Sequence, residues 1–284
     1  MSSPAEYFSM TIRRPKMYCG LGFLPIGFCA LSTVAVITTY VLAVSNNHVY
    51  PVFPTISETG EEEPERNVFS LLLSLSSFIA FIIVIIRYKQ YNFVSEYNEQ
   101  EQRKIVKINR LGLIVGIIVC VGGAIVASFQ ADRGASLQGH LAGATCTFAG
   151  GILYMWINTY LSMKMIDCGI NSKALCAFRL LASFISFFAF ILCIATRYIS
   201  IHESNNGTNK PGKRECWKPE QSGYEMHLVS SIAEWITAFT FLAYFLSFYR
   251  EFDRISIEFT VRGTNIAALP FEVSGDERNT PLLA

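Results

Sequence analysis

Two ionisable side chains, Arg179 and Glu234, stand inside long apolar segments of this sequence. Charge within a bilayer is costly, so such residues indicate a functional site when a partner can be named. Arg179 lies about five residues from the end of its segment, and we expect its long stem to carry the guanidinium to the headgroups, with a lipid-headgroup site as the alternative. Glu234 lies about seven residues inside its segment, and its side chain is too short to leave.

Glu234 belongs to a polar set with helical spacing. His227, Ser230, Ser231 and Glu234 recur at i, i+3, i+4 and i+7, so they share one face of a helix, and His140 opens another apolar segment on the same side. We predict that Glu234 faces the bundle interior and bonds to this polar cluster, lining a small cavity for a lipid headgroup. Histidine titrates near 6.5, so an acidic lumen would charge both histidines and strengthen their attraction to Glu234. The alternative is a structural polar network without a sensing role.

Enzyme motifs are absent from the sequence. It contains no G-x-S-x-G, H-E-x-x-H or Walker A sequence and no polar cluster with metal-ligand spacing. His and Ser on one helix face near Glu234 would suit acyl chemistry, but a shared face is far weaker evidence than triad geometry. The prediction is therefore a non-enzymatic protein with no catalytic residue, metal or cofactor.

The elements that must position these residues are membrane helices. The 284 residues are 51% hydrophobic and 16% charged, with a mean hydropathy of +0.35, which is typical of a membrane protein. The net charge of +1 gives no pull toward nucleic acid, so we expect membrane lipids as partners instead. Since roughly 20 apolar residues cross a bilayer, the sequence predicts an all-α bundle of six transmembrane helices. The predicted spans are residues 18–44, 67–86, 111–129, 136–163, 174–197 and 227–249.

Glycines indicate how two of these spans pack. Gly112 and Gly116 form a G-x-x-x-G sequence in the third span, and Gly139 and Gly143 repeat it in the fourth. Small residues at this spacing let helix backbones approach closely in lipid. We therefore expect the third and fourth spans to pack as a hairpin, with a dimerisation face as the alternative.

Basic residues indicate the orientation. With both termini in the cytosol, the cytosolic segments hold 15 of the 23 Lys and Arg residues, as the positive-inside rule favours. The predicted organisation is a cytosolic N-terminal tail at 1–17, a membrane domain at 18–249 and a cytosolic C-terminal tail at 250–284. The one N-x-[ST] sequon, at Asn206, then lies on the luminal side, where N-glycosylation occurs.

The predicted first luminal loop carries a motif. Its residues are Pro54, Ile56, Ser57, Glu58 and Gly60, followed by Pro64 and Glu65. Such a turn-rich acidic loop is most simply an ordered solvent loop. However, a P-x-I-S-[DE]-x-G element between the first two of six spans resembles the FRAG/DRAM/SFK superfamily. Ala127-Ser128-Phe129-Gln130, His140 with Gly143-Ala144, Tyr154 with Trp156, and His227 through Glu234-Trp235 resemble it too.

The resemblance covers residues 17 to 253 and is greatest to the damage-regulated autophagy modulator (DRAM) family, in which Asp is usual at the position of Glu58. It implies a multi-pass protein of lysosomal and endosomal membranes that promotes autophagy, working with autophagy proteins and without established catalytic residues. Relatives in the superfamily imply two alternatives, a plasma-membrane scaffold that regulates phosphoinositide synthesis and a Golgi factor in GPI-anchor lipid remodelling. The oligomeric state is not predicted.

Both tails contain sequences that sorting adaptors could read. Tyr7-Phe8-Ser9-Met10 fits the Y-x-x-Φ pattern. Glu277, Leu282 and Leu283 resemble an acidic dileucine signal for endosomes and lysosomes, with one residue too many between the acid and the leucines. These residues are candidate sorting signals, and both lie on the predicted cytosolic side, where adaptors are found.

Overall fold

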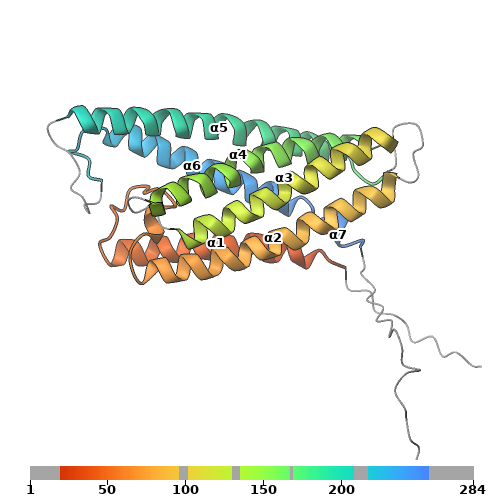
Figure 1. Ribbon diagram of the computed structural model, residues 1–284, viewed down its shortest axis with the longest axis horizontal. Coiled ribbons are helices and arrows are strands. Elements are labelled where there is room, and N and C mark those ends of the chain that lie inside the picture. Colours follow the sequence, from red (N-terminus) through yellow and green to blue (C-terminus); the bar gives the residue numbers. More distant parts are fainter. Residues whose placement is uncertain (1–19, 96–101, 130–134, 167–168, 208–216, 256–284) are drawn as a thin grey trace, which may run out of the picture.

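The protein is a bundle of long helices (Figure 1). The computed structural model describes residues 20–95, 102–129, 135–166, 169–207 and 217–255. Its elements are α1 (Phe23–Ser45), the 3-10 helix η1 (Glu58–Gly60), α2 (Glu65–Ser95), α3 (Gln102–Ser128), α4 (Ala135–Lys164), α5 (Lys173–Asn206), α6 (Tyr224–Leu246) and α7 (Tyr249–Phe252). These described ranges contain no β-strand, so the predicted all-α fold is confirmed.

Five helices are long and apolar enough to cross a membrane: α1, α2, α3, α5 and α6 with its continuation into α7. This makes the chain a multi-pass membrane protein. Helix α4 has 30 residues, a length of roughly 45 Å at 1.5 Å per residue, but its sequence is less apolar. Several of its polar side chains, including His140, Asn158 and Thr159, are buried against other helices. These polar side chains of α4 therefore face the interior of the bundle and not the lipid.

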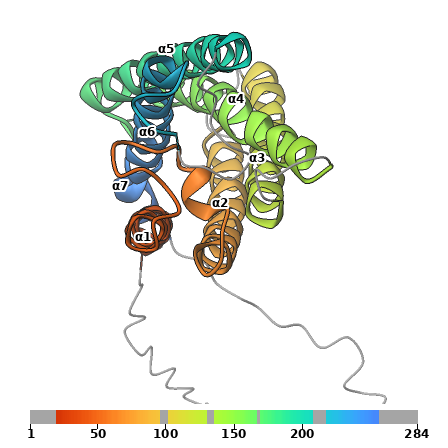
Figure 2. The same ribbon diagram turned by 90° about the vertical axis from the view of Figure 1, so that its left-hand side faces the viewer.

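The helices follow one another around the bundle as a ring (Figure 2). Each long helix packs on the next in sequence, and α6 and α7 return to α1. The first and last described residues lie at the same end of the bundle, where the Leu21 N–H donates to the Phe252 carbonyl at 2.9 Å. An even number of crossings follows from this arrangement, while the side of the membrane on which the termini lie stays a prediction.

The predicted hairpin of the third and fourth spans is present as α3 and α4, and small residues explain its close packing. A Cβ atom on Gly143 would lie 2.8 Å from Ile125 Cγ2 and 2.9 Å from the Gly122 carbonyl oxygen. A Cβ on Gly116 would lie 2.6 Å from Val84 Cγ1 of α2. Since such distances are sterically forbidden, these glycines let α3 approach both neighbours.

A buried ion cluster joins three helices at the end where the termini lie. Glu251 of α7 pairs with Arg87 of α2 at 3.1 Å and with Arg179 of α5, and the three side chains are at most 2% exposed. The Phe248 ring lies between the two guanidinium groups, 4.3 Å from that of Arg87 and 4.8 Å from that of Arg179. One carboxylate, with the face of one aromatic ring, thus stabilises two buried cations.

This cluster corrects the expectation for Arg179. Its guanidinium does not extend to the headgroups, since the residue is fully buried and also donates to Ser162 Oγ at 2.7 Å and to Ser247 Oγ at 2.9 Å. Arg87 and Glu251 fell in predicted cytosolic segments, but α2 continues past Arg87, and α7 packs back against the bundle. Side chains inside the fold therefore bind the Arg179 guanidinium, which needs no contact with solvent or headgroups.

Changing Glu251→Gln leaves two buried guanidinium groups without a counter-charge. Removing one partner of a buried ion pair costs about 3–5 kcal/mol. We expect the purified protein in detergent to lose about 10 °C of apparent Tm, measured by size-exclusion chromatography after heating. The matched control is Glu225→Gln, because Glu225 is an exposed acid of α6. Equal Tm values for the two variants would contradict a stabilising role for the cluster.

Candidate functional site

The motif loop, residues 54–60, folds back between the ends of the helices. Pro54, Thr55, Ile56, Thr59 and Gly60 are buried. The Thr59 hydroxyl is hydrogen-bonded to that of Thr39 in α1 at 3.1 Å, and Gly60 lies so close to α2 that a Cβ there would be 2.7 Å from the Phe69 ring. The expectation of a plain solvent loop is therefore wrong, because the motif residues are packed between helices.

Glu58 is the centre of this loop's polar contacts. Its carboxylate accepts a hydrogen bond from the Thr55 N–H at 2.9 Å and faces His227 Nε2 at 3.3 Å and Arg197 Nη1 at 3.7 Å. Burial raises the pKa of Glu58, but the hydrogen bond from His227 and the charge of Arg197 outweigh burial and hold this pKa below its usual value. The carboxylate therefore stays charged at mildly acidic pH, and its anchoring effect is lost only as the pH falls through the lowered pKa.

The ring of His227 is fixed between two charged groups. Arg197 Nη1 donates to His227 Nδ1 at 2.9 Å, so Nδ1 is an acceptor and the proton is on Nε2, which donates to Glu58. The Trp217 ring stacks on the imidazole with centroids 4.5 Å apart and an interplanar angle of 7°. Protonation of Nδ1 would break the bond from Arg197. The partner of His227 is thus Glu58, and the predicted pairing of His227 with Glu234 is wrong.

His140 of α4 binds the loop as well. Its Nδ1–H donates to the Phe129 carbonyl at 2.8 Å, which leaves Nε2 to accept from the Ser57 hydroxyl at 2.9 Å. The Trp235 indole N–H donates to the Pro54 carbonyl at 2.8 Å. The loop is thereby bonded to α4 and α6 as well as to α5.

Glu234 lies below the loop, as predicted for a residue facing the interior. Its carboxylate faces the backbone N–H groups of Ile56 and Ser57. It also lines an internal cavity of about 140 Å³, bounded mainly by apolar side chains of α1, α2, α3, α4 and α6. Glu234 is the one carboxylate among the described residues that line it. Tyr154 lines it too, and its buried hydroxyl has no partner in the described part of the chain. The motif loop thus forms one end of an apolar cavity with a single acid.

The other predicted site residues have separate positions. Ser230 donates to the Cys193 carbonyl at 2.9 Å and Ser231 to the His227 carbonyl at 2.9 Å, so both hydroxyls bind backbone and not Glu234. Glu65 is fully buried and bonds to His48 Nδ1 at 3.0 Å and to Asn46 Nδ2 at 2.7 Å, whereas Pro64 is exposed.

Asn206 is exposed at the last position of α5. The candidate sorting signals lie outside the described residues: Tyr7, Met10, Glu277, Leu282 and Leu283.

Arg197 and Trp217 are the site residues that sequence reasoning missed. Arg197 stood at the predicted end of the fifth span and was counted only as a luminal charge, but α5 continues to Asn206, and Arg197 sits on its inner face. The available signal was that Arg197 and the motif acid Glu58 both lie at the predicted luminal side of the membrane. Trp217 follows a segment outside the described residues and had no sequence signal beyond its type.

The chemistry of the site favours binding over catalysis. Ser57 and His140 have the contact expected of a nucleophile and its base, but the cavity that both of them line is only about 10 Å³, too small for a substrate. Ser57 also lines the larger cavity with Glu234, and His140 does not. Within the described residues no group of His, Cys, Asp and Glu side chains could hold a metal ion. The remaining polar groups hold the loop in place.

Comparisons with known proteins cover nearly all of the described chain. The family described as "Frag1/DRAM/Sfk1/Cwh43P N-terminal domain" matches residues 20–255. The human "DNA damage-regulated autophagy modulator protein 2" is 34% identical over 241 residues, which are 84% of this chain and 86% of the relative. The human "DNA damage-regulated autophagy modulator protein 1" is 31% identical, over 84% of this chain and 93% of the relative.

A more distant relative is the human "Transmembrane protein 150A", 25% identical over 87% of each chain. No solved structure matches the chain. The matches cover the helix bundle together with the motif loop and the polar residues that hold it. The chain therefore belongs to the Frag1/DRAM/Sfk1 family of multi-pass membrane proteins, and the DNA damage-regulated autophagy modulators are among its relatives.

Proposed function

We propose that this protein positively regulates autophagy from the lysosomal or endosomal membrane as a non-enzymatic interaction or lipid-sensing protein. The observation that carries the proposal is the match, along almost the whole membrane bundle, with relatives named as autophagy modulators. Its partners would be membrane lipids, autophagy proteins and sorting adaptors that read the tails.

The internal cavity supports the lipid part of this proposal. Its wall is mainly apolar, and Glu234 supplies one polar contact next to the motif loop. An apolar site with few polar groups suits an amphipathic ligand. Because the Glu234 carboxylate faces the backbone of Ile56 and Ser57, a ligand that binds this carboxylate would change the position of the loop. A ligand bound in the cavity would in this way change the luminal surface of the protein.

The contacts of the site's hydroxyl groups support the non-enzymatic part. Ser57 donates to His140, and the cavity that both side chains line is only about 10 Å³. The hydroxyls of Ser230 and Ser231 donate to carbonyl groups of their own bundle. Each hydroxyl is therefore used for structure.

Lysosomal residence depends, in this proposal, on the dileucine sequence in the C-terminal tail. We expect the tagged protein to co-localise with a lysosomal marker. The variant Leu282→Ala/Leu283→Ala should move to the cell surface, because an adaptor that binds the two leucine side chains does not bind alanines in their place. Turnover of an autophagosome marker, measured in cells lacking the endogenous protein, should rise with the intact protein and less with the variant.

The matched control changes two other aliphatic residues of the same tail, Ile266→Ala and Leu269→Ala, and should stay lysosomal. A surface location of the unchanged protein would contradict the lysosomal assignment and favour the plasma-membrane scaffold.

Glycosylation tests the proposed orientation. We expect the protein to lose mass on endoglycosidase treatment, and Asn206→Gln to abolish that shift on a gel, because the exposed end of α5 would face the lumen. Asn205→Gln, one residue away and outside the sequon, should keep the shift. A wild-type protein that carries no glycan while reaching the lysosome would contradict the luminal placement of this loop.

A further inference from the structure

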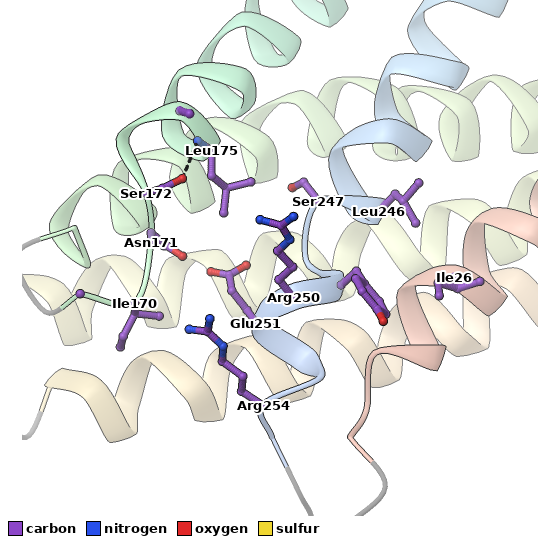
Figure 3. A pocket seen from close by; sticks show the side chains of 13 residues that line it. Ile26, Ile170, Asn171, Ser172, Leu175, Leu246, Ser247, Arg250, Glu251 and Arg254 are labelled. Atoms are coloured by element: carbon purple, nitrogen blue, oxygen red, sulfur yellow. Dashed lines mark hydrogen bonds between the residues drawn. The ribbon is translucent and has the colours of Figure 1, made fainter.

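A groove lies at the end of the bundle where α5 begins and α6 passes into α7 (Figure 3). It encloses about 740 Å³ between residues 169–175 on one side and residues 246–254 on the other, with Ile26 of α1 at its edge. Because two membrane helices end here, the groove is at the level of the membrane surface. It is separate from the motif loop, since Arg179 and Arg197 of α5 are about 27 Å apart along the helix.

The lining of the groove divides into an apolar and a cationic part. Ile26, Leu175 and Leu246 form the apolar part, and Arg250 and Arg254 supply the cations. Figure 3 shows the Arg250 and Arg254 side chains reaching toward the space around Glu251 from one short segment. Both arginines are exposed, and within the described residues neither takes part in an ion pair. Their charge is therefore free to bind an anion.

Glu251 does not neutralise this groove. It is the one acidic residue in the lining, but its carboxylate is already shared by Arg87 and Arg179. The first turn of α5 adds the positive end of a 34-residue helix, with Ser172 as its N-cap. The groove thus carries a net positive field at the membrane surface, where it attracts the phosphate groups of lipids.

Asn171 supplies an independent sign of a missing ligand. This residue lines the groove and is only 5% exposed. Its Nδ2 donates to the Ser162 carbonyl at 3.2 Å, but no described group donates to its Oδ1. A buried acceptor without a donor is costly and unusual in a native fold. A ligand that satisfies it must present a hydrogen-bond donor, such as a hydroxyl or an ammonium group.

We propose that this groove binds the headgroup of an anionic phospholipid that carries a hydrogen-bond donor beside its phosphate. Arg250 and Arg254 bind the phosphate, Asn171 Oδ1 accepts from the donor, and Ile26, Leu175 and Leu246 contact the acyl chain. The proposal makes the lipid part of the proposed function specific. It is measured by binding alone, so its failure is distinguishable from a failure of the lysosomal or autophagy assignment.

The test uses the full-length protein in phosphatidylcholine nanodiscs, with binding of a fluorescent short-chain phosphatidylinositol measured by anisotropy. The variant Arg250→Gln/Arg254→Gln should weaken binding at least about tenfold. The matched control is Arg103→Gln/Arg110→Gln, which removes two exposed arginines from the start of α3, outside the groove. It should change the affinity less than about twofold. Equal losses in both double variants, or no loss in either, would overturn the proposal.

Two further arms identify the ligand chemistry. Asn171→Leu should lower the affinity for phosphatidylinositol to that for phosphatidic acid, which lacks a headgroup hydroxyl, and an unchanged preference would overturn the role of Asn171. Competition with inorganic phosphate distinguishes a lipid from a free anion. Displacement of the probe by phosphate at the same concentration as by unlabelled lipid would overturn the lipid assignment. Should Asn171→Leu not fold, the arginine variants and the competition decide the outcome.

Discussion

Two carboxylates at opposite ends of the bundle supply the counter-charges for its cationic side chains, one in a buried cluster and one in a partly exposed cluster. At one end Glu251 binds Arg87 and Arg179, and at the other Glu58 binds Arg197 and His227. Helix α5 contributes an arginine to both ends. Removing Glu251 would leave Arg87 and Arg179 facing protein instead of water, so this acid joins α7 to α2 and α5. Glu58 joins the motif loop to α5 and α6.

The two ends differ in what their carboxylates hold. Glu251 lies in a sealed cluster under Phe248, and its contacts join helices α2, α5 and α7. Glu58 belongs to the motif loop, and its contacts attach this loop to α5 and α6. Loops are in general more mobile than the helices they connect. The cavity with Glu234 begins directly under that loop, and the groove with Arg250 and Arg254 lies beside the sealed cluster. Both candidate ligand sites thus adjoin a buried carboxylate.

The arrangement of helices could be predicted from the sequence, because long apolar runs and close-packing glycines are local signals. The glycine pairs of the third and fourth spans predicted the α3–α4 hairpin for this reason. The partners of the charges could not be predicted. Glu58 and His227, or Arg87 and Glu251, are far apart in the chain, and nothing in their local sequence specifies which charges meet. The predicted spans end before Arg87 and Glu251, because hydropathy gives the length of a span and not the extent of a helix.

The central claim is that the motif loop is a folded part of the bundle held by Glu58. Amide hydrogen exchange in nanodiscs tests it most directly, because the N–H groups of Thr55, Thr59 and Gly60 are all bonded within the loop. The account predicts slow exchange across residues 55–60 and faster exchange at the exposed residues Val52 and Phe53. It also predicts that Glu58→Gln speeds exchange in the loop and leaves the middle of α1 unchanged. Fast exchange of the loop in the unchanged protein, or a loop indifferent to Glu58→Gln, would contradict it.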